Sequence, residues 1–381
     1  MRSLYVVFTG PEKVEAREET VDDPGPGEVL CRAEKSLVSI GTETHCLRGV
    51  FEPGTNWADW VRYPFRPGYS MVGRVVKIGA GVSGFAEGDR LATSAPHQQY
   101  FLLTPHAPHG GGGDTRGQRS PSLPAERGFD RDRGRFSTGT AGRDTSTGQP
   151  FGVVPLPEGV ASEDGTWMPL ACTTQLGIRR AALALGESVG VVGLGMLGQL
   201  VVQYLWLGGA RRVVAIDTVT GRLETARAHG ATHVLARSAA DAREDVERLT
   251  GGKMLDVVFD VTGHPAVLAP STRLLRRLGR VVLLGDTTTP SQQHLGPRVL
   301  ADSLSIHAIH ALMRPDLATE WNPWTAEEMT ALFFDYLRQG RMRVGDLITH
   351  RHAPAEAPSV YAGLLRDRSS AIGVLFDWST L

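Results

Sequence analysis

The chain has 381 residues, and its 40 lysines and arginines nearly balance its 41 aspartates and glutamates, giving a formal net charge of -1. This charge gives no electrostatic reason to expect binding to nucleic acid or a membrane surface, and the length allows two domains with separate cores. Three cysteines without paired spacing favour a reducing, cytoplasmic setting, and no run approaches the roughly 20 apolar residues of a membrane span.

The first hundred residues alternate short apolar runs with turn signals, which is typical of an all-β module. Strands are predicted over residues 4–8, 29–33, 73–78 and 90–93. Turns at 24–28, 79–84 and 87–89 separate them.

Residues 106–150 differ sharply from the rest of the chain. They are rich in Gly, Arg, Asp, Ser and Thr and contain almost no aliphatic residue. Such a segment buries too little surface to offset its ordering entropy, so we predict a long, largely disordered surface loop. Its basic residues are balanced by acidic ones, which makes a tail that binds nucleic acid the less favoured interpretation.

A strand over 153–156 and a helix over 167–185 lead into the most informative stretch. Residues 189–192 form an apolar, β-branched strand, followed by the G-x-G-x-x-G pattern at Gly193, Gly195 and Gly198. The first glycine permits a tight turn, the second lets the backbone approach a pyrophosphate, and the third allows close packing of helix on strand. The strand, turn and helix together predict a dinucleotide site, with the pyrophosphate at the helix N-terminus.

A second strand over 213–216 ends at Asp217, which follows Gly198 by 217 − 198 = 19 positions. A carboxylate about 20 residues after the turn accepts hydrogen bonds from the ribose hydroxyls and repels a 2′-phosphate, so we expect NAD(H). Arg222 is expected either to bind ribose or phosphate or to be solvated. The other cofactor candidates follow the turn or end a strand: Met196, Leu197, Thr218, Thr262, Gly263, Leu284, Gly285 and Asp286.

Further α/β units follow. Strands are predicted over 255–260, 280–284 and 303–308, with a helix over 266–277. The tail is predicted to contain helices over 326–339 and 357–366 and strands over 347–350 and 371–376.

The segments GEVLCRAEKSLVSIGTETH, FRPGYSMVGRVVKIGAGVSGFAEGDRL and LITHRHAPAEAPSVYAGLL flank the glycine-rich turn. Together they resemble the medium-chain dehydrogenase/reductase superfamily of zinc-type alcohol dehydrogenases, and locally its bacteriochlorophyllide dehydrogenase branch. The resemblance implies an α/β protein with a Rossmann doubly wound parallel sheet and a GroES-like β-barrel catalytic domain. It implies a catalytic domain over 1–155, a nucleotide domain over 156–300 and a C-terminal return over 301–381, in a homodimer or homotetramer.

The sequence departs from this family at the catalytic zinc ligands. Ile40 stands in place of the Cys of C-G-T-D, and Tyr69 and Ser70 stand in place of the His and Glu of G-H-E. The third ligand falls at residues 168–170, which read Met-Pro-Leu, and Cys172 alone builds no site. We therefore expect no metal, although Glu43, His45, His97 and His106 could in principle recruit a different one.

Without a metal, other groups must manage the substrate proton and oxygen. Thr42 and His45 match the Thr and His of C-G-T-D-x-H, and Tyr69 would place a phenol near the hydride acceptor. Each has an alternative: Thr42 as a helix cap, His45 as a surface helix residue, Tyr69 as a filler of the volume left by the metal.

The favoured hypothesis is a zinc-independent, NAD(H)-dependent oxidoreductase acting on a secondary alcohol such as a polyol, cyclitol, sugar or polyketide-like alcohol. A zinc-free reductase of activated C=C bonds, a redox-neutral enzyme with tightly bound NAD, and a non-catalytic NAD-binding protein remain alternatives. The expected partner is a small-molecule substrate. The choice of substrate depends on the resemblance alone.

Overall fold

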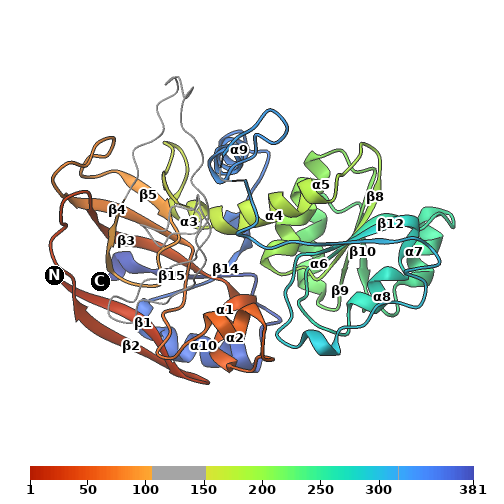
Figure 1. Cartoon of the computed structure of the whole chain (residues 1–381), viewed down its shortest axis with the longest axis horizontal. Helices are drawn as coiled ribbons and strands as arrows, with labels where there is room; N and C mark the ends of the chain where they lie inside the picture. Colours follow the sequence, from red (N-terminus) through yellow and green to blue (C-terminus); the bar gives the residue numbers. More distant parts are fainter. Residues whose placement is uncertain (105–151, 316) are drawn as a thin grey trace, which may run out of the picture.

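The structure is a computed structural model that describes residues 1–104, 152–315 and 317–381. The chain forms two lobes, each built on its own sheet and joined by helix α4 (Met168–Arg180) (Figure 1). The predicted loop over 106–150, which includes His106, lies outside the described residues.

The first lobe contains a seven-stranded sheet to which both ends of the chain contribute. A path of six strands runs in the order β14-β15-β3-β4-β5-β7, and β6 pairs with β3. The two C-terminal strands enter this sheet because β15 pairs antiparallel with β3. A hairpin of β1 (Arg2–Gly10) and β2 (Lys13–Thr20) lies beside it. The sheet strands are β3 (Val29–Val38), β4 (Met71–Ile78), β5 (Arg90–Thr93), β6 (Tyr100–Leu103), β7 (Val153–Pro155), β14 (Ile348–His352) and β15 (Gly373–Asp377).

The second lobe contains a six-stranded parallel sheet in the order β10-β9-β8-β11-β12-β13. The strand order reverses between β8 and β11, which is where doubly wound sheets bind ligands, at the carboxyl ends of the strands. The predicted C-terminal return begins at residue 301, but β13 pairs with β12 and belongs to this sheet. The sheet of the second lobe therefore extends beyond residue 300. The strands are β8 (Ser188–Val192), β9 (Arg212–Asp217), β10 (His233–Ala236), β11 (Leu255–Asp260), β12 (Leu275–Leu283) and β13 (Ser305–Ala308).

Helices cover both lobes. α5 and α6 pack against the second sheet, α4 contacts α5 and α9 between the lobes, and α1 contacts α10 below the first sheet (Figure 1). Besides α4, the helices are α1 (Ile40–Arg48), α2 (Asn56–Trp60), α3 (Ser162–Gly165), α5 (Met196–Leu207), α6 (Thr220–Ala228), α7 (Arg243–Thr250), α8 (Leu268–Thr272), α9 (Ala326–Arg338) and α10 (Ala357–Arg366).

The helix predicted over 266–277 is wrong in its second half. Only α8 is helical, and β12 already begins at Leu275, which pairs with Leu255 of β11. Arg276 is held against β11 by an ion pair with Asp256 at 2.5 Å. Pairing with a neighbouring strand therefore overrides the local helical pattern of the leucines and arginines.

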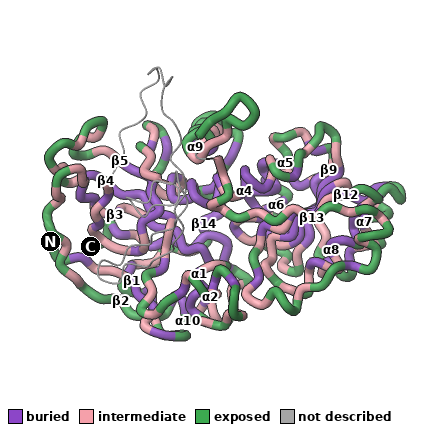
Figure 2. The backbone as a smooth tube through the Cα atoms, in the orientation of Figure 1, coloured by how far each residue is buried: buried purple, intermediate pink, exposed green. Residues whose placement is uncertain are grey.

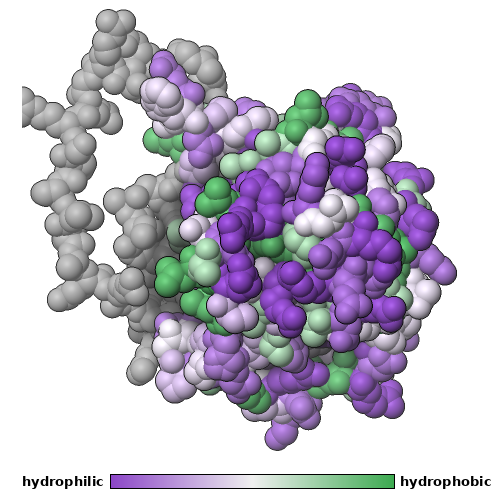
Figure 3. Space-filling view, turned by 90° about the vertical axis from the view of Figure 1, so that its right-hand side faces the viewer, coloured by the Kyte–Doolittle hydropathy of each residue, from purple (hydrophilic) through white to green (hydrophobic). Residues whose placement is uncertain are grey.

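Buried residues concentrate in the two sheets and the helices between the lobes (Figure 2). The face of the second lobe seen in Figure 3 is mostly hydrophilic, with scattered apolar residues. Among the described residues, no helix combines the length and the apolar character needed to cross a membrane.

Candidate active site

The glycine-rich turn between β8 and α5 has the geometry that the sequence predicts. Gly193 has φ of 90°, and a Cβ atom on Gly198 would lie 2.0 Å from the carbonyl oxygen of Gly193. A Cβ atom on Gly195 would meet nothing within 4 Å, so the space above this residue is open. α5 begins at Met196, and no side chain caps it. The residues present fit a dinucleotide phosphate at this helix end.

Asp217 lies directly across from this turn. Its Oδ2 accepts a hydrogen bond of 2.7 Å from the backbone N–H of Leu194, and its Oδ1 accepts one of 2.9 Å from that of Val219. Each carboxylate oxygen keeps acceptor capacity, because each has two lone pairs. The side chain is therefore fixed in place and can still accept ribose hydroxyls, and the exposed Thr218 lies next to it.

The loops after β11 and β12 meet the same turn. A Cβ atom on Gly193 would lie 2.8 Å from Cγ2 of Thr262, and one on Gly263 would lie 2.8 Å from the carbonyl oxygen of Asp286. A Cβ atom on Gly285 would lie 2.3 Å from the nitrogen of Gly263. The structure therefore brings these five predicted residues together at the carboxyl edge of the sheet.

Two aspartates lie under and beside these loops. The backbone N–H of Leu284 donates to the carbonyl oxygen of Asp260, and burial raises the pKa of the Asp260 carboxyl, opposed by hydrogen bonds from Thr262. Burial also raises the pKa of Asp286, opposed by the charge of His310 and by the indole of Trp57. Because Trp57 belongs to α2, Asp286 lies next to the first lobe.

Arg222 is anchored to the C-terminal segment between α10 and β15. Its Nη2 donates to the backbone carbonyls of Arg368, at 2.5 Å, and Ala371, at 3.1 Å. The guanidinium is therefore not simply solvated, and its binding of ribose or phosphate stays a prediction.

Three hydroxyl groups form a chain on the first lobe. The phenol of Tyr69 donates a 2.5 Å hydrogen bond to Oγ of Ser39, and Oγ1 of Thr42 lies 3.3 Å from the same phenol oxygen. Ser39 is the N-cap of α1, and Thr42 lies in the first turn, so the cap is not Thr42. Burial raises the pKa of Tyr69 to about 12, so the phenol keeps its proton at neutral pH. Sequence reasoning missed Ser39, although a serine directly before a helix is a capping signal.

His45 is on the same helix but is not part of this chain of hydroxyls. Its ring lies 5.5 Å from that of Trp57, between centroids, and is partly buried. Burial, with the charges of Arg368 and Arg48, lowers the pKa of His45 to about 4. The imidazole is therefore neutral at physiological pH and can accept a proton only weakly.

Behind the hydroxyl chain is a buried polar network that connects the first lobe to the C-terminal tail. Glu43 accepts hydrogen bonds from the backbone N–H of Ser39 at 2.7 Å and from the phenol of Tyr361. His97 Nε2 lies 3.1 Å from Glu43 Oε2, and His97 Nδ1 lies 2.8 Å from Oγ of Ser36. Glu43 and His97 therefore have structural partners, and both are committed to this network.

The residues at the zinc-ligand positions do not fit a zinc ion. Ile40 and Met168 are buried in one hydrophobic cluster, with Tyr69 packed against it, and the buried Ser70 hydroxyl has no hydrogen-bond partner. Cys172 lies 3.3 Å from the hydroxyl of Thr330. Within the described parts of the chain, no group of three or more His, Cys, Asp or Glu residues is placed to hold a metal. Zinc in proteins is bound by cysteine thiolate, imidazole nitrogen or carboxylate oxygen, and none of the side chains at these positions supplies one of these groups.

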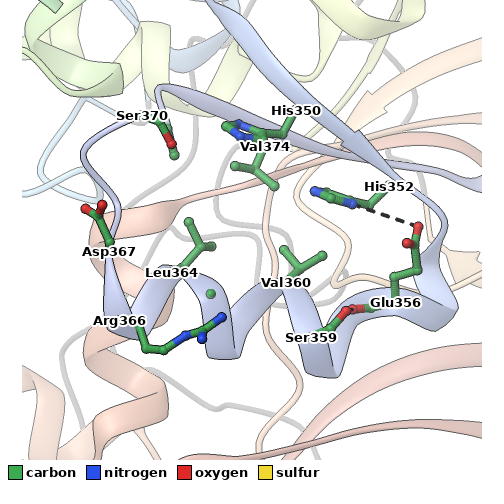
Figure 4. Close-up of a pocket in the computed structure, with 12 residues that line it drawn as sticks. His350, His352, Glu356, Ser359, Val360, Leu364, Arg366, Asp367, Ser370 and Val374 are labelled. Carbon is green, nitrogen blue, oxygen red and sulfur yellow. Dashed lines mark hydrogen bonds and ion pairs between the residues drawn. The ribbon is translucent and has the colours of Figure 1, made fainter.

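A separate cavity of about 500 Å³ lies between β14 and α10 (Figure 4). The rings of His350 and His352 stack along one wall, and Val360 and Leu364 form part of its apolar surface. None of the predicted catalytic or cofactor residues lines it.

Comparison with known proteins identifies the family. A sequence model of the alcohol dehydrogenase GroES-like domain matches residues 25–112, and one of the zinc-binding dehydrogenase matches residues 197–324. An alcohol dehydrogenase of Rhizobium meliloti is 31% identical over 271 residues, covering 70% of this chain and 72% of the relative. The 2-desacetyl-2-hydroxyethyl bacteriochlorophyllide A dehydrogenase of Cereibacter sphaeroides is 24% identical over 378 residues, covering 99% of each.

Solved structures share the fold over the whole chain. A short chain alcohol dehydrogenase of Escherichia coli complexed with NADH has a TM-score of 0.72 at 17% identity, covering 99% of both chains. A putative zinc-binding dehydrogenase of Sinorhizobium meliloti bound to NADP has a TM-score of 0.71 at 20% identity, with the same coverage.

The chain therefore belongs to the zinc-type alcohol dehydrogenase-like family of medium-chain dehydrogenases/reductases, as the sequence motifs predict. It is an oxidoreductase of that type.

Proposed function

We propose that this protein is a zinc-independent, NAD(H)-dependent dehydrogenase that interconverts a secondary alcohol and a ketone. The observation that carries the proposal is the chain of hydroxyl groups from Thr42 through Tyr69 to Ser39, next to the positions where the family has zinc ligands. It offers hydrogen-bonding groups to a substrate oxygen at a place where this chain offers no metal ligands.

The hydroxyl chain can serve both directions of the reaction. With Tyr69 donating to Ser39, Thr42 donates to Tyr69, and the lone pairs of Thr42 Oγ1 can accept a hydrogen bond from the hydroxyl of an alcohol, whose proton is released to solvent water as the hydride leaves. Hydroxyl groups rotate, so the reverse order lets Ser39 donate to Tyr69, Tyr69 to Thr42, and Thr42 to a ketone oxygen. The raised pKa of Tyr69 keeps the phenol neutral in either case.

A nicotinamide dinucleotide would be held by the glycine-rich turn and Asp217, and it supplies the acceptor or donor of the hydride. The position of the Asp217 carboxylate favours NAD(H), because a 2′-phosphate would be repelled there. The NADP-bound and NADH-bound structures of the same fold show that the fold alone does not choose between the two cofactors.

Aromatic residues that pack against His45, three positions after Thr42 on α1, support a substrate with an apolar face. Phe51 stacks on Trp57 with 6.2 Å between centroids, and Trp57 and Trp60 are also 6.2 Å apart. Such rings pack against the C–H faces of sugars, cyclitols and polyols or against a polyketide-like chain. The class of relatives, which includes the Erythritol/L-threitol dehydrogenase of Mycolicibacterium smegmatis, agrees with a polyhydroxylated substrate.

The test is a panel of secondary alcohols, together with the matching ketones and a set of enones, each offered with NAD(H) and NADP(H). We expect NAD-dependent oxidation of at least one polyol, cyclitol, sugar or polyketide-like alcohol, measured by the absorbance of the reduced nicotinamide. Turnover of enones alone, or faster turnover with NADP(H), would contradict the proposal. NADH fluorescence retained by the purified protein would point to the redox-neutral alternative.

A further inference from the structure

The separate cavity between β14 and α10 lies where two parallel strands face a helix (Figure 4). His350 of β14 pairs with Val374 of β15, and His352 follows two positions later, so all three side chains line the cavity. Where helices cover parallel strands, the covered side chains are typically Val, Ile and Leu, but here two of them are imidazoles. The volume of about 500 Å³ is within the range of small-molecule pockets.

The middle of this cavity is apolar. Val360 and Leu364 come from successive turns of α10, and Val374 comes from β15. All three are buried, so they form a floor at the bottom of the cavity. Gly363 of α10 also lines the space, and a Cβ atom there would meet nothing within 4 Å. The apolar body of a ligand therefore has both a surface to contact and room to occupy.

The hydrogen bonds of Thr349 fix the tautomer of His350. The hydroxyl of Thr349 donates its one proton to the carbonyl oxygen of Gly373 at 3.0 Å. His350 Nδ1 lies 2.8 Å from the same hydroxyl oxygen and must therefore be the donor in that contact. In a neutral imidazole the second nitrogen is then an acceptor. No described residue donates to Nε2 of His350, so its lone pair is unused.

Glu356 adds a negative charge at the end of the cavity where α10 begins. Its Oε2 accepts from the backbone N–H of Ala353 at 2.7 Å, and its Oε1 accepts from none of the residues that the structure describes. The hydroxyl of Ser359 donates to the carbonyl oxygen of Glu356 at 2.8 Å, which leaves Ser359 only its lone pairs. The uncommitted atoms at this end of the cavity are therefore acceptors.

The other end of the cavity has no such excess of acceptors and negative charge. Arg366 and Asp367 contribute one charge of each sign there, and the Asp367 carboxylate accepts from the backbone N–H and the hydroxyl of Ser369. Ten positions separate Glu356 from Arg366, which is about 15 Å along an α-helix. Figure 4 shows the two side chains at opposite ends of α10. The charge of Arg366 therefore does not neutralise Glu356.

We propose that this cavity binds a primary amine that has an apolar body. The ammonium group lies at Glu356 and at Nε2 of His350, and the apolar body lies against the floor formed by Val360, Leu364 and Val374. An ammonium group supplies a positive charge and three N–H donors, which complement these acceptors. The proposal does not depend on the proposed function, because none of the catalytic or cofactor candidates lines this cavity.

The test is a set of ligand-observed NMR titrations at pH 8, where an ordinary imidazole is neutral. The probe is benzylamine, and benzamide and benzoate are neutral and negatively charged probes of similar size. Glu356→Gln removes the charge and keeps an acceptor for the N–H of Ala353. Its matched control is Glu327→Gln, an exposed glutamate in the first turn of α9. His350→Phe removes the acceptor nitrogen.

Gly363→Leu tests the location, because its side chain would fill the cavity. We expect it to abolish benzylamine binding while the melting temperature stays the same or rises, since Leu is a better helix former than Gly. Glu356→Gln should weaken binding about two- to fivefold, as for a half-exposed charge pair. His350→Phe should weaken it by a similar factor, through one lost hydrogen bond. Glu327→Gln should have no effect, and melting temperatures verify that all variants are folded.

Any of four results would overturn the proposal. Wild-type protein that does not bind benzylamine has no such site, and equal binding to Gly363→Leu would place the amine elsewhere. Unchanged affinity in both Glu356→Gln and His350→Phe would show that these acceptors do not hold the ammonium group. Tighter binding of benzoate than of benzylamine would show that Arg366 sets the charge preference. All four are read from binding, so loss of dehydrogenase activity would contradict the proposed function alone.

Discussion

His97 Nε2 lies 3.1 Å from Glu43 Oε2, and neither side chain is more than 1% exposed. Glu43 also accepts from the phenol of Tyr361 in α10, and Ser36, on the other side of His97, accepts from the indole of Trp378 at 2.9 Å. The network therefore connects the helix that carries the hydroxyl chain to the last residues of the protein. It adds buried polar contacts to the pairing of β15 with β3 that holds the C-terminal segment on the first lobe.

Removing the carboxylate of Glu43 should destabilise the fold strongly. Glu43→Ala leaves the donors of Ser39, His97 and Tyr361 without an acceptor, and breaking a buried pair in this way costs about 3–5 kcal/mol. Urea unfolding followed by circular dichroism measures the loss in the free energy of unfolding. Glu158→Ala, at an exposed position, is the control and should change it by less than about 0.5 kcal/mol. Equal stability of both variants would show that the network contributes little.

Tyr69→Phe should lower turnover and leave NAD binding unchanged. The substitution interrupts the path from Thr42 to Ser39, and general acid–base help is worth about 10²–10⁴ in rate. Ser39→Ala and Thr42→Val should act in the same direction. The control is Tyr63→Phe, because the phenol of Tyr63 donates to the backbone carbonyl of Cys46 and is outside the chain of hydroxyls. Full activity of all three hydroxyl variants would place the proton route elsewhere.

Asp217→Ala should weaken NAD binding and relax the preference for NAD over NADP. A lost hydrogen bond to a charged group costs about 1.5–3 kcal/mol, and removal of the charge ends the repulsion of a 2′-phosphate. Titration of both cofactors into wild type and variant gives the two affinities. The variant also loses the carboxylate that accepts from the backbone N–H of Leu194. Its melting temperature is therefore measured in parallel, to separate a loss of folding from a loss of cofactor contacts. Wild-type protein that prefers NADPH would refute the assignment of Asp217.

Because of His45, we expect the free energy of unfolding to be smaller in mild acid than at neutral pH. Its pKa in the folded protein is about 4, below the unfolded value of about 6.5, so between these two pH values the unfolded state binds a proton that the folded state does not. The stabilisation is complete above about pH 6.5 and is lost as pH falls toward 4, by about 1–3 kcal/mol after allowance for partial exposure. Denaturant unfolding from pH 7.5 to 4.5 measures this loss.

His45→Gln is the comparison for that experiment, because other titrating groups change the stability in the same pH range. The variant should lose less stability than wild type between about pH 6.5 and pH 4.5. Parallel stability curves would show that the pKa of His45 is the same in the folded and unfolded states, which would contradict this prediction.

The second lobe was predictable because its signals are local. The turn at Gly193 and the strand that ends at Asp217 follow one another in the sequence, and each has a periodicity or a glycine that identifies it. The second half of the helix over 266–277 was wrong, because pairing of Leu275 with Leu255 is not visible in either segment alone. Sheet partners that are distant in sequence decided the structure there.

The candidate site was predictable only in part, for a similar reason. Thr42 and Tyr69 were found by family motifs, and the structure brings them to 3.3 Å. Ser39 was missed because its role depends on a phenol 30 positions away. Arg222 was expected to bind ribose or phosphate or to be solvated, and the carbonyls of residues 368 and 371 that it contacts in the structure are partners that no local pattern indicates.

In the proposed reaction, the hydroxyl chain of Thr42, Tyr69 and Ser39 takes the place of a catalytic zinc. The most direct test is to purify the protein without a metal-binding tag, determine zinc by elemental analysis, and assay the same sample with a responsive alcohol and NAD before and after treatment with a chelator. We predict far less than one zinc per chain and the same turnover in both assays. Near one zinc per chain, with turnover lost on chelation and restored by added zinc, would contradict the account.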